Sequence, residues 1–474
     1  MVFSSLTFIA FFLPITLLLY FISKNKTWRN VVLLVLSLIF YAWGEPRFVF
    51  LMIISIAVNY AAGLFIDKYK KARMKRYARI SLIIALAISL GFLFWFKYSS
   101  FLANTILSIF GSSSQVAAKV LPIGISFYTF QIITYTVDVY KGRVPVQRDI
   151  VKLALYISFF PQLIAGPIVN YTYIEPYLDH RKITPAQFFN GLSRFFVGLG
   201  KKILIANLCG EVLNTLTLTG DLSCLSAWLG AICYTLQIYF DFSGYSDMAI
   251  GMGKMFGFKF LENFNYPYTS TSVTDFWRRW HISLGTFFRD YVYIPLGGNR
   301  CSRLMQMRNL FVVWLLTGLW HGASWNFVIW GLYYGVILVF EKFVFGKVLK
   351  KIPVILRWLY TILLVIIGWV FFYHESLADG AHQIAAMFGF GASAGSDALA
   401  VYCLKEYLVL IIIAAIACIP WTVFIKNILY GGKKKHKQPR NVVIVKFAGA
   451  SLLFVLCIIM LAASSFNPFL YFRF

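Results

Sequence analysis

The chain has 474 residues, of which 60% are hydrophobic, 19% aromatic and only 13% charged. A soluble domain carries about 25% charged residues, so this composition, with a mean hydropathy of +0.73, excludes an ordinary soluble protein. The net charge of +26 comes largely from short basic loops between apolar runs. Such loops set membrane topology and contact anionic lipid headgroups, so the charge does not indicate nucleic-acid binding.

The apolar runs predict an all-α, multi-pass membrane protein with about 10–13 membrane segments, some short or re-entrant. The first run lacks the basic region and cleavage site of a secretory signal and is predicted to be a retained helix. Regular spans are expected at 2–22, 31–43 continuing through a Glu45-Pro46 turn to 47–66, 80–97, 120–140, 228–253, 308–321, 324–345, 355–373, 405–425 and 443–465. Less regular stretches lie at 98–110, 150–169 and 186–213, and a loop is expected at about 374–400.

We interpret residues 1–474 as one membrane-embedded domain, with N-terminal helices at 1–140, a motif-bearing core at 141–345 and C-terminal helices at 346–474. Pro161, Gly166 and Pro167 interrupt the apolar run at 159–169, which predicts a broken helix there. The basic loops 24–29, 67–79 and 141–148 fall on one side if 31–66 is a helical hairpin. The positive-inside rule makes that side cytoplasmic and places the amino terminus outside.

A histidine stands inside the apolar segment "LLTGLWHGASW", residues 315–325. Helical spacing puts Thr317, His321 and Ser324 on one face, and Gly318 and Gly322 form a G-x-x-x-G pair that favours close helix packing. A buried histidine is usually a hydrogen-bonded structural residue. A neutral imidazole also suits general-base catalysis, so the segment alone leaves both interpretations open.

Residues 274–300 are predicted to form one amphipathic helix at the membrane interface, with His281 at the edge of its apolar stripe. The stripe consists of Phe276, Trp280, Leu284, Phe287, Phe288 and Tyr291. The same stretch and its continuation carry arginine but no lysine, at positions 278, 279, 289, 300, 303 and 308. A guanidinium binds phosphate in a bidentate manner, which favours a phosphate-bearing substrate, although topology alone also places basic residues here.

Two carboxylates lie in the apolar span 228–253. Asp241 has Gln237 and Tyr245 one turn away on either side, and Asp247 follows near the end of the span. A carboxylate in the bilayer needs a partner, and His321 or an arginine would serve as one, in a catalytic or a purely structural pair. The seven cysteines are scattered without a C-x-x-C pair, and no zinc, nucleotide or hydrolase motif occurs. We therefore expect neither a metal nor a bound cofactor.

The segments "FDFSGYSDMAIG", "NFNYPYTSTSVTDFWRRWHISLGTFFRDYVYIPLGGNR" and "LTGLWHGASWNFVIWG" resemble the membrane-bound O-acyltransferase superfamily, most closely its alginate O-acetyltransferase branch. The resemblance implies a ring of helices around a central tunnel, with His321 as the catalytic residue and His281 as a second position near the cytoplasmic side. It also implies orienting roles beside the tunnel for Asp241, Ser243, Tyr245 and Trp320. Acetyl-CoA is the implied donor, and Arg278, Arg289 and Arg300 are the candidates to bind its phosphates.

The expected function is acetyl transfer across a bacterial cytoplasmic membrane, for O-acetylation of an extracytoplasmic polysaccharide. The implied partner is a separate extracytoplasmic transferase of the SGNH-hydrolase type. D-alanyl transfer proteins of teichoic acid share "FSGYSDMA" and an "FW.RWH" stretch, and remain the alternative within the superfamily. A transporter or flippase without bond chemistry, and a scaffold for the partner, are the alternatives outside catalysis.

Overall fold

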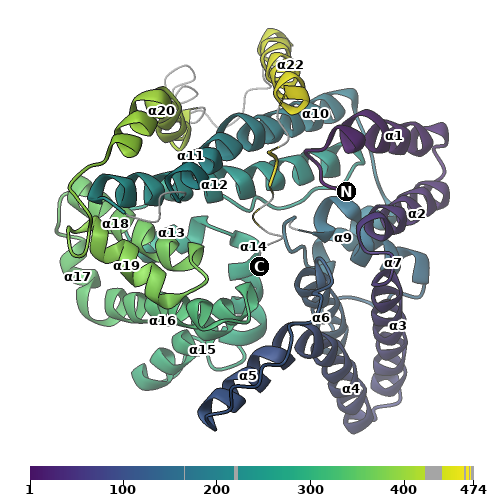
Figure 1. The fold of residues 1–474 in the computed structure, drawn as a ribbon. Helices are drawn as coiled ribbons and strands as arrows, with labels where there is room; N and C mark the ends of the chain where they lie inside the picture. Colours follow the sequence, from purple (N-terminus) through teal and green to yellow (C-terminus); the bar gives the residue numbers. More distant parts are fainter. Residues whose placement is uncertain (165, 218–221, 422–439, 464–465, 469, 471–474) are drawn as a thin grey trace. The chain divides into compact units, whose positions relative to one another are not determined.

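The computed structural model describes residues 1–164, 166–217, 222–421, 440–463, 466–468 and 470, with side chains of the last long helix described from residue 444. This part of the chain is helical and has no strand (Figure 1), in agreement with the predicted all-α class. It forms two compact units, one of Met1–Phe195 with Tyr245–Leu261 and one of Phe196–Gly244 with Glu262–Phe474. The single-domain scheme with its three sections stays a prediction.

The first unit contains the amino-terminal helices. They are η1 (Phe8–Phe12), α1 (Leu13–Ile22), α2 (Lys26–Gly44), α3 (Val49–Lys71), α4 (Lys75–Leu93), η2 (Phe94–Tyr98), α5 (Ser99–Ile109), α6 (Ile125–Lys141), α7 (Ile150–Ser158), α8 (Phe160–Leu163) and α9 (Tyr171–Asp179). Most of α10 (Pro185–Gly200) and the last part of α12 (Cys224–Met255) also belong to this unit.

The second unit contains the rest of α10 and α12 and the helices that carry both histidine motifs. Its other helices are η3 (Lys201–Ala206), α11 (Asn207–Thr217), η4 (Pro267–Thr269), α13 (Val273–Arg279), α14 (Ile282–Phe288), η5 (Arg289–Tyr293), α15 (Arg303–His321), α16 (Trp325–Phe340), η6 (Glu341–Phe345), α17 (Gly346–Leu349), α18 (Val354–Tyr373), α19 (Leu377–Met387), α20 (Ala398–Ala417) and α22 (Arg440–Ala463).

A polar contact joins three apolar helices in the first unit. Asn59 of α3 donates to the Ser89 hydroxyl of α4 at 3.0 Å and accepts from the Thr136 hydroxyl of α6 at 2.8 Å. All three side chains are buried. Hydrogen bonds of this kind join helices where apolar surfaces alone give little preference for one packing. The predicted turn at Glu45-Pro46 is also present, because α2 ends at Gly44 and α3 begins at Val49.

The predicted break at 159–169 is confirmed. Helix α7 ends at Ser158, and Pro161 lies in the first turn of the four-residue helix α8. Of the residues that follow, 164 and 166–170 are described and are not helical, and α9 begins at Tyr171. The described residues of the segment are buried, as expected for irregular backbone in a membrane protein.

Helices α15 and α16 pack closely because glycines face one another. A Cβ on Gly318 would overlap the backbone carbonyl of Phe327, and a Cβ on Gly331 would overlap that of Trp314. Gly322, the second member of the predicted G-x-x-x-G pair, lies against the Phe327 ring. Small residues therefore allow the close backbone approach that the sequence predicted.

The prediction of one helix over 274–300 is wrong. Helix α13 ends at Arg279 and α14 starts at Ile282, because His281 adopts a left-handed conformation with φ 45° and ψ 53°. The apolar stripe is nevertheless buried at Phe276, Trp280 and Leu284. Burial of the stripe was predictable from side-chain type, whereas the break depends on contacts from a distant part of the chain.

Two smaller expectations also fail. Ser324 does not share a helix with His321, because α15 ends at His321, Gly322 is extended and Ser324 precedes α16. The expected loop at 374–400 contains α19, which begins after the Ser376 side chain accepts a hydrogen bond from the Ala378 N–H.

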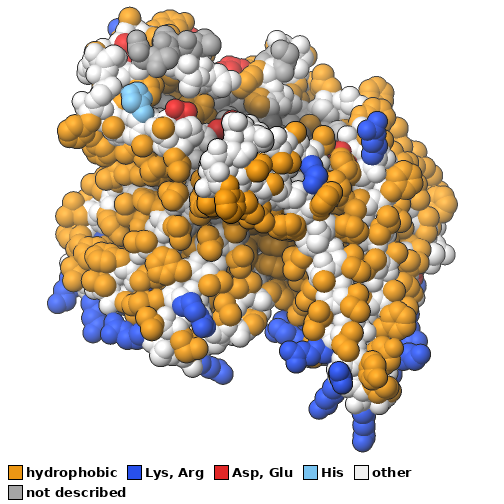
Figure 2. Space-filling model, turned by 60° about the horizontal axis from the view of Figure 1, so that its bottom comes forward, with side chains coloured by type: hydrophobic (Ala, Val, Ile, Leu, Met, Phe, Trp, Pro, Cys, Tyr) orange, Lys and Arg blue, Asp and Glu red, His pale blue; other side chains and the backbone are white. Residues whose placement is uncertain are grey.

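Seven helical segments in the described chain are long and apolar enough to cross a membrane. They are Lys26–Gly44, Val49–Lys71, Lys75–Ile109, Trp325–Leu349, Val354–Tyr373, Ala398–Ala417 and Ile444–Ala463. Hydrophobic side chains cover much of the face seen in Figure 2, as expected for a surface solvated by lipid. The protein is thus a multi-pass membrane protein, and the count of 10–13 segments stays a prediction. The predicted ends 422–425 and 464–465 and the basic residues 432–439 lie outside the described residues.

Candidate active site

His321 is the last residue of α15 and lies among aromatic rings of the second unit. Its ring centroid is 4.9 Å from that of Trp320, 5.1 Å from that of Trp330 and 5.0 Å from that of Phe372. The residue is only 7% exposed. The rings hold the imidazole in one place and exclude bulk water around it, which suits either a structural or a catalytic histidine.

A small chamber of about 20 Å³ opens beside His321. A cavity of roughly 10–15 Å³ on this measure holds one water molecule, so the chamber accepts a group of about the size of a water or a methyl. Most of its lining is apolar. The lining residues are Ile238, Asp241, Phe242, Trp280, His321, Trp369, Phe372 and Leu470.

The carboxylate of Asp241, in the chamber wall, forms a buried ion pair. Its Oδ1 lies 2.9 Å from Lys202 Nζ, and both side chains are 3% exposed. Its Oδ2 accepts the backbone N–H of Leu470 at 2.9 Å, and Lys202 also donates to Asn207 Oδ1 at 2.8 Å and to the carbonyl of Pro468. The sequence analysis named His321 or an arginine as the partner and missed Lys202. The signal for it is a lysine pair, 201–202, inside the apolar run 186–213.

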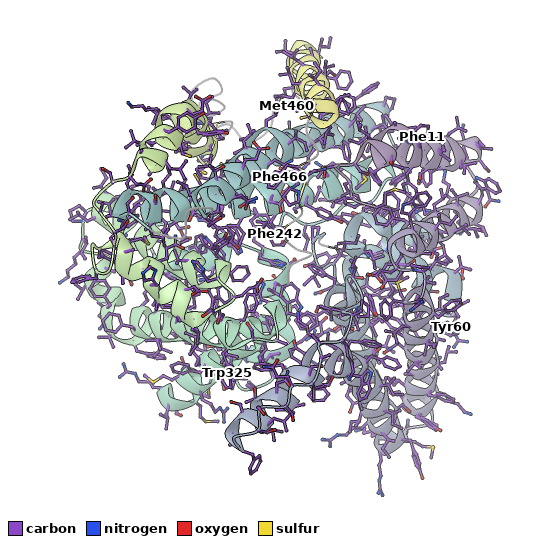
Figure 3. All side chains as sticks on the ribbon, in the orientation of Figure 1. Phe11, Tyr60, Phe242, Trp325, Met460 and Phe466 are labelled. Atoms are coloured by element: carbon purple, nitrogen blue, oxygen red, sulfur yellow. The ribbon has the colours of Figure 1, made fainter. Side chains whose placement is uncertain are left out.

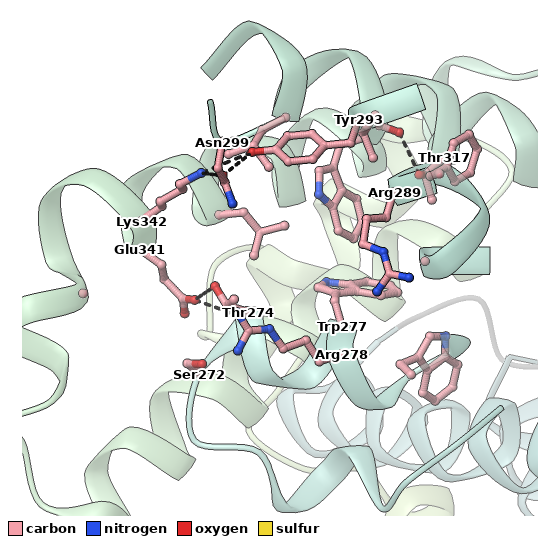
Figure 4. A pocket seen from close by; sticks show the side chains of 18 of the residues that line it. Ser272, Thr274, Trp277, Arg278, Arg289, Tyr293, Asn299, Thr317, Glu341 and Lys342 are labelled. Carbon is pink, nitrogen blue, oxygen red and sulfur yellow. Dashed lines mark hydrogen bonds between the residues drawn. The ribbon is translucent and has the colours of Figure 1, made fainter. Parts of the chain in front are cut away.

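A second, much larger cavity of about 780 Å³ lies in the same unit. His281, Arg278 and Arg289 line it, and Figure 4 places the two arginines on separate elements around the opening. Further basic residues were not predicted. They are Lys342, Lys347 and Lys350, from the segment between α16 and α18, and Arg357, on α18. The cavity therefore presents cations from three stretches of the sequence, an arrangement suited to a ligand with several phosphates.

Trp280 lines both the large basic cavity and the chamber beside His321. Trp280 is buried, and its ring centroid lies 4.8 Å from that of Trp369. Thr317, one turn before His321, also lines the large cavity and donates its hydroxyl hydrogen to the Val313 carbonyl. The two histidine motifs thus line two cavities that share Trp280.

Glu341 fixes one wall of the large cavity. Its carboxylate accepts the backbone N–H groups of Val273 and Thr274 at 2.8 Å each and the Thr274 hydroxyl at 2.5 Å (Figure 4). A carboxylate at the amino terminus of α13 satisfies N–H groups that the helix leaves unpaired and interacts favourably with its dipole. Glu341 thereby orients the helix that carries Arg278, a role that sequence reasoning missed.

His281 is buried between two aromatic rings, outside the seven candidate spans. Its ring centroid is 4.8 Å from that of Phe242, whose buried position on α12 is labelled in Figure 3, and 5.6 Å from that of Trp320. Burial lowers the pKa of His281 to about 3, and its backbone hydrogen bond opposes the shift only in part. The imidazole is therefore neutral at physiological pH.

The remaining candidates are not all brought together. Trp320 contacts both histidines through its ring. Ser243 is buried on α12 without lining either cavity, and Tyr245 belongs to the first unit, where it stacks on Phe3 at 4.5 Å. Arg300 is exposed and is not among the residues that line the large cavity.

Comparisons with known proteins show the family of this chain. The model of the membrane-bound O-acyltransferase family matches residues 144–379, which include both histidines. A probable alginate O-acetylase of Azotobacter vinelandii is 39% identical over the full length of both chains. This protein belongs to the membrane-bound O-acyltransferase family. It is accordingly an acyltransferase of the membrane, and the predicted resemblance to the alginate O-acetyltransferase branch is confirmed.

Two other relatives differ in the acyl group that their names give. A peptidoglycan O-acetyltransferase of Helicobacter pylori is 37% identical over 82% of this chain and 80% of its own. A teichoic acid D-alanyltransferase of Bacillus subtilis is 31% identical over 52% of this chain and 66% of its own. Similarity is thus higher and more extensive to the O-acetylating relatives than to the D-alanylating one.

Proposed function

We propose that this protein transfers acetyl groups from cytoplasmic acetyl-CoA, across the membrane, for O-acetylation of an extracytoplasmic polysaccharide, with His321 as the general base. The observation that carries the proposal is that His321 lines a methyl-sized chamber and that this chamber shares Trp280 with a large basic cavity. Full-length similarity to an alginate O-acetylase, and strong similarity to a peptidoglycan O-acetyltransferase, support acetyl as the group and a polysaccharide as the acceptor.

The residues divide the reaction between the two cavities. The phosphates of the donor bind to the cations of the large cavity, with Arg278 and Arg289 in its lining and Arg300 as a further candidate outside it. The thioester then lies beside Trp280, so that the methyl of its acetyl group occupies the chamber. His321 removes the proton from the acceptor hydroxyl, whose oxygen attacks the thioester carbonyl. The carbon–sulfur bond breaks, and the proton leaves with the thiol product.

The other assigned residues orient these groups. His281 lies on the donor side, and Asp241 lies in the chamber wall, held by Lys202. Trp320 packs between the two histidines, and Ser243 and Tyr245 belong to the same motif on α12. No bound cofactor takes part in this scheme, and the donor is a substrate.

We propose that the donor side faces the cytoplasm of a bacterial cell, with the protein in the cytoplasmic membrane and its amino terminus outside, and the positive-inside rule applied to the basic loops supports this orientation. The acceptor side then faces the extracytoplasmic space. There we propose that a transferase of the SGNH-hydrolase type receives the acetyl group and modifies the polymer.

The test uses inside-out membrane vesicles from cells that make the protein together with its native polysaccharide. Acetyl-CoA labelled in the acetyl group and, separately, in the adenine ring is supplied from outside. We expect the acetyl label in the polysaccharide and the adenine label outside. Entry of both labels would identify a transporter. Incorporation of D-alanine from a carrier protein, without acetyl incorporation, would identify a D-alanyl transferase.

Arg278→Ala is expected to raise KM for acetyl-CoA about tenfold or more, because a charge-assisted hydrogen bond contributes about 1.5–3 kcal/mol. The effect should shrink for donors without the nucleotide phosphates, such as acetyl-pantetheine, and as salt increases. Arg47→Ala serves as the matched comparison, since Arg47 is an exposed arginine of the first unit and does not line the cavity. Equal changes for the two variants would contradict the assignment of this cavity to the donor phosphates.

A further inference from the structure

Asn263 lies between α12 and α13 and is fully buried, at 0% exposed. Its backbone carbonyl accepts the Ile282 N–H at 2.9 Å, and two residues later the Asn265 N–H donates to the Arg279 carbonyl at 2.9 Å. The segment of Asn263 therefore runs beside the break between α13 and α14. These contacts explain why His281 keeps a left-handed backbone, which costs about 1–2 kcal/mol for a residue other than glycine.

The side chain of Asn263 also faces this break, and one of its contacts fixes the orientation of the amide. The backbone N–H of Ser283 donates to Oδ1 at 3.2 Å. A backbone N–H can only donate, so the atom that it faces must be the amide oxygen. The Ser283 hydroxyl donates to the same oxygen at 2.9 Å.

The imidazole of His281 meets the same oxygen. Its Nδ1 lies 3.2 Å from Asn263 Oδ1 and 3.4 Å from the Ser283 hydroxyl oxygen. Because the Ser283 hydroxyl donates to Oδ1, and because Oδ1 can only accept, the contact between Nδ1 and Oδ1 requires a proton on Nδ1. In a neutral imidazole, the other nitrogen, Nε2, then carries the lone pair.

We propose that Asn263 is a positioning residue that holds His281 as the Nδ1–H tautomer, so that Nε2 accepts a hydrogen bond from the donor in the large cavity. The pantetheine arm of CoA offers amide N–H groups for this bond; that part of the inference rests on the proposed function. Phe242 and Trp320 pack on the ring, and the charged residues that line the same cavity are Arg278, Arg289, Lys342, Lys347, Lys350, Arg357 and Glu341. Burial keeps the ring neutral, as its lowered pKa indicates.

The tautomer is testable without any enzymatic assay. In the wild-type protein labelled with 15N-histidine, the His281 signals are assigned by their loss in His281→Gln. We expect a protonated Nδ1 and an unprotonated Nε2 near neutral pH, and a mixture of both tautomers in Asn263→Ala. The Nε2–H tautomer in the wild type would overturn the proposal, whatever the reaction catalysed and however well the variants fold.

The role in donor binding is tested with Asn263→Asp. A carboxylate beside the ring stabilises the imidazolium and raises the pKa of His281. As pH falls from about 8 to about 5 through the raised pKa, Nε2 gains a proton and stops accepting, so KM for acetyl-CoA should rise about 5- to 10-fold. Asn265→Asp adds the same charge at an exposed position two residues away and should follow the wild-type profile.

The outcomes separate the two levels of inference. Identical pH profiles for folded Asn263→Asp and Asn265→Asp would overturn the role of His281 in donor binding. If the wild type itself turned over no acetyl-CoA, the proposed function would be rejected. The assigned role of Nε2 in donor binding would then be rejected as well. The tautomer of His281 would still be determined by the 15N spectrum.

Discussion

His321→Ala is expected to lower acetyl transfer at least about 10²–10⁴-fold, the usual contribution of a general base. The physical reason is the position of the imidazole in the wall of the methyl-sized chamber, enclosed by Trp320, Trp330 and Phe372. The measurement is incorporation of labelled acetyl groups into polysaccharide by inside-out vesicles that contain equal amounts of each variant.

Two further variants separate catalysis from folding. His321→Gln keeps a polar side chain of similar size, and should be equally inactive while its midpoint of thermal unfolding stays near that of the wild type. His382→Ala removes an exposed histidine of the same unit and should retain full activity. Normal acetylation by either His321 variant would reject the general-base assignment and leave a structural histidine.

Lys202→Ala is expected to destabilise the protein by about 3–5 kcal/mol, because it leaves the Asp241 carboxylate buried without its cation. Both side chains of the pair are almost completely buried, and the loss also removes the donor to Asn207 and Pro468. The measurement is thermal unfolding of the purified protein in detergent. Lys405→Ala, at an exposed lysine of the same unit, should change the midpoint very little.

A double variant distinguishes the stability of the pair from its place in the site. Lys202→Met with Asp241→Leu replaces both charges by apolar side chains of similar length, which usually restores most of the stability lost in the single variants. We expect it to fold and to remain poorly active, since Asp241 lines the chamber. A double variant as unstable as Lys202→Ala would contradict this account of the ion pair.

The fold was predictable where its physics is local. Runs of apolar residues long enough to cross a bilayer can only be helices there, because each backbone N–H must be paired within its own segment. The turn between α2 and α3, the break at 159–169 and the close α15–α16 packing follow from turn residues, prolines and glycines. The prediction of one helix over 274–300 was wrong because the backbone of Asn263, outside that segment, accepts the Ile282 N–H beside the left-handed residue His281.

The candidate site was predictable in its residue types and less so in its contacts. His321, His281 and Arg278 stood out because ionisable groups are costly in apolar surroundings and guanidinium groups suit phosphate. The sequence did not single out the lysines Lys342, Lys347 and Lys350 as site residues, since lysines at the end of a membrane helix are explained equally well by topology. The sequence did not indicate a role for Glu341 either. Its hydrogen-bond donors are backbone N–H groups, which no sequence pattern reveals.

By itself, the sequence determined the all-helical membrane class, the positions of most apolar helices and, through its motifs, the family to which the chain belongs. Only the tertiary structure decided that Lys202 is the partner of Asp241, that Trp280 lines two cavities and that Asn263 contacts His281. The reason is physical. Helix formation and burial depend on residues within a few turns, whereas a site is made by side chains from distant segments, and their distances are set by packing.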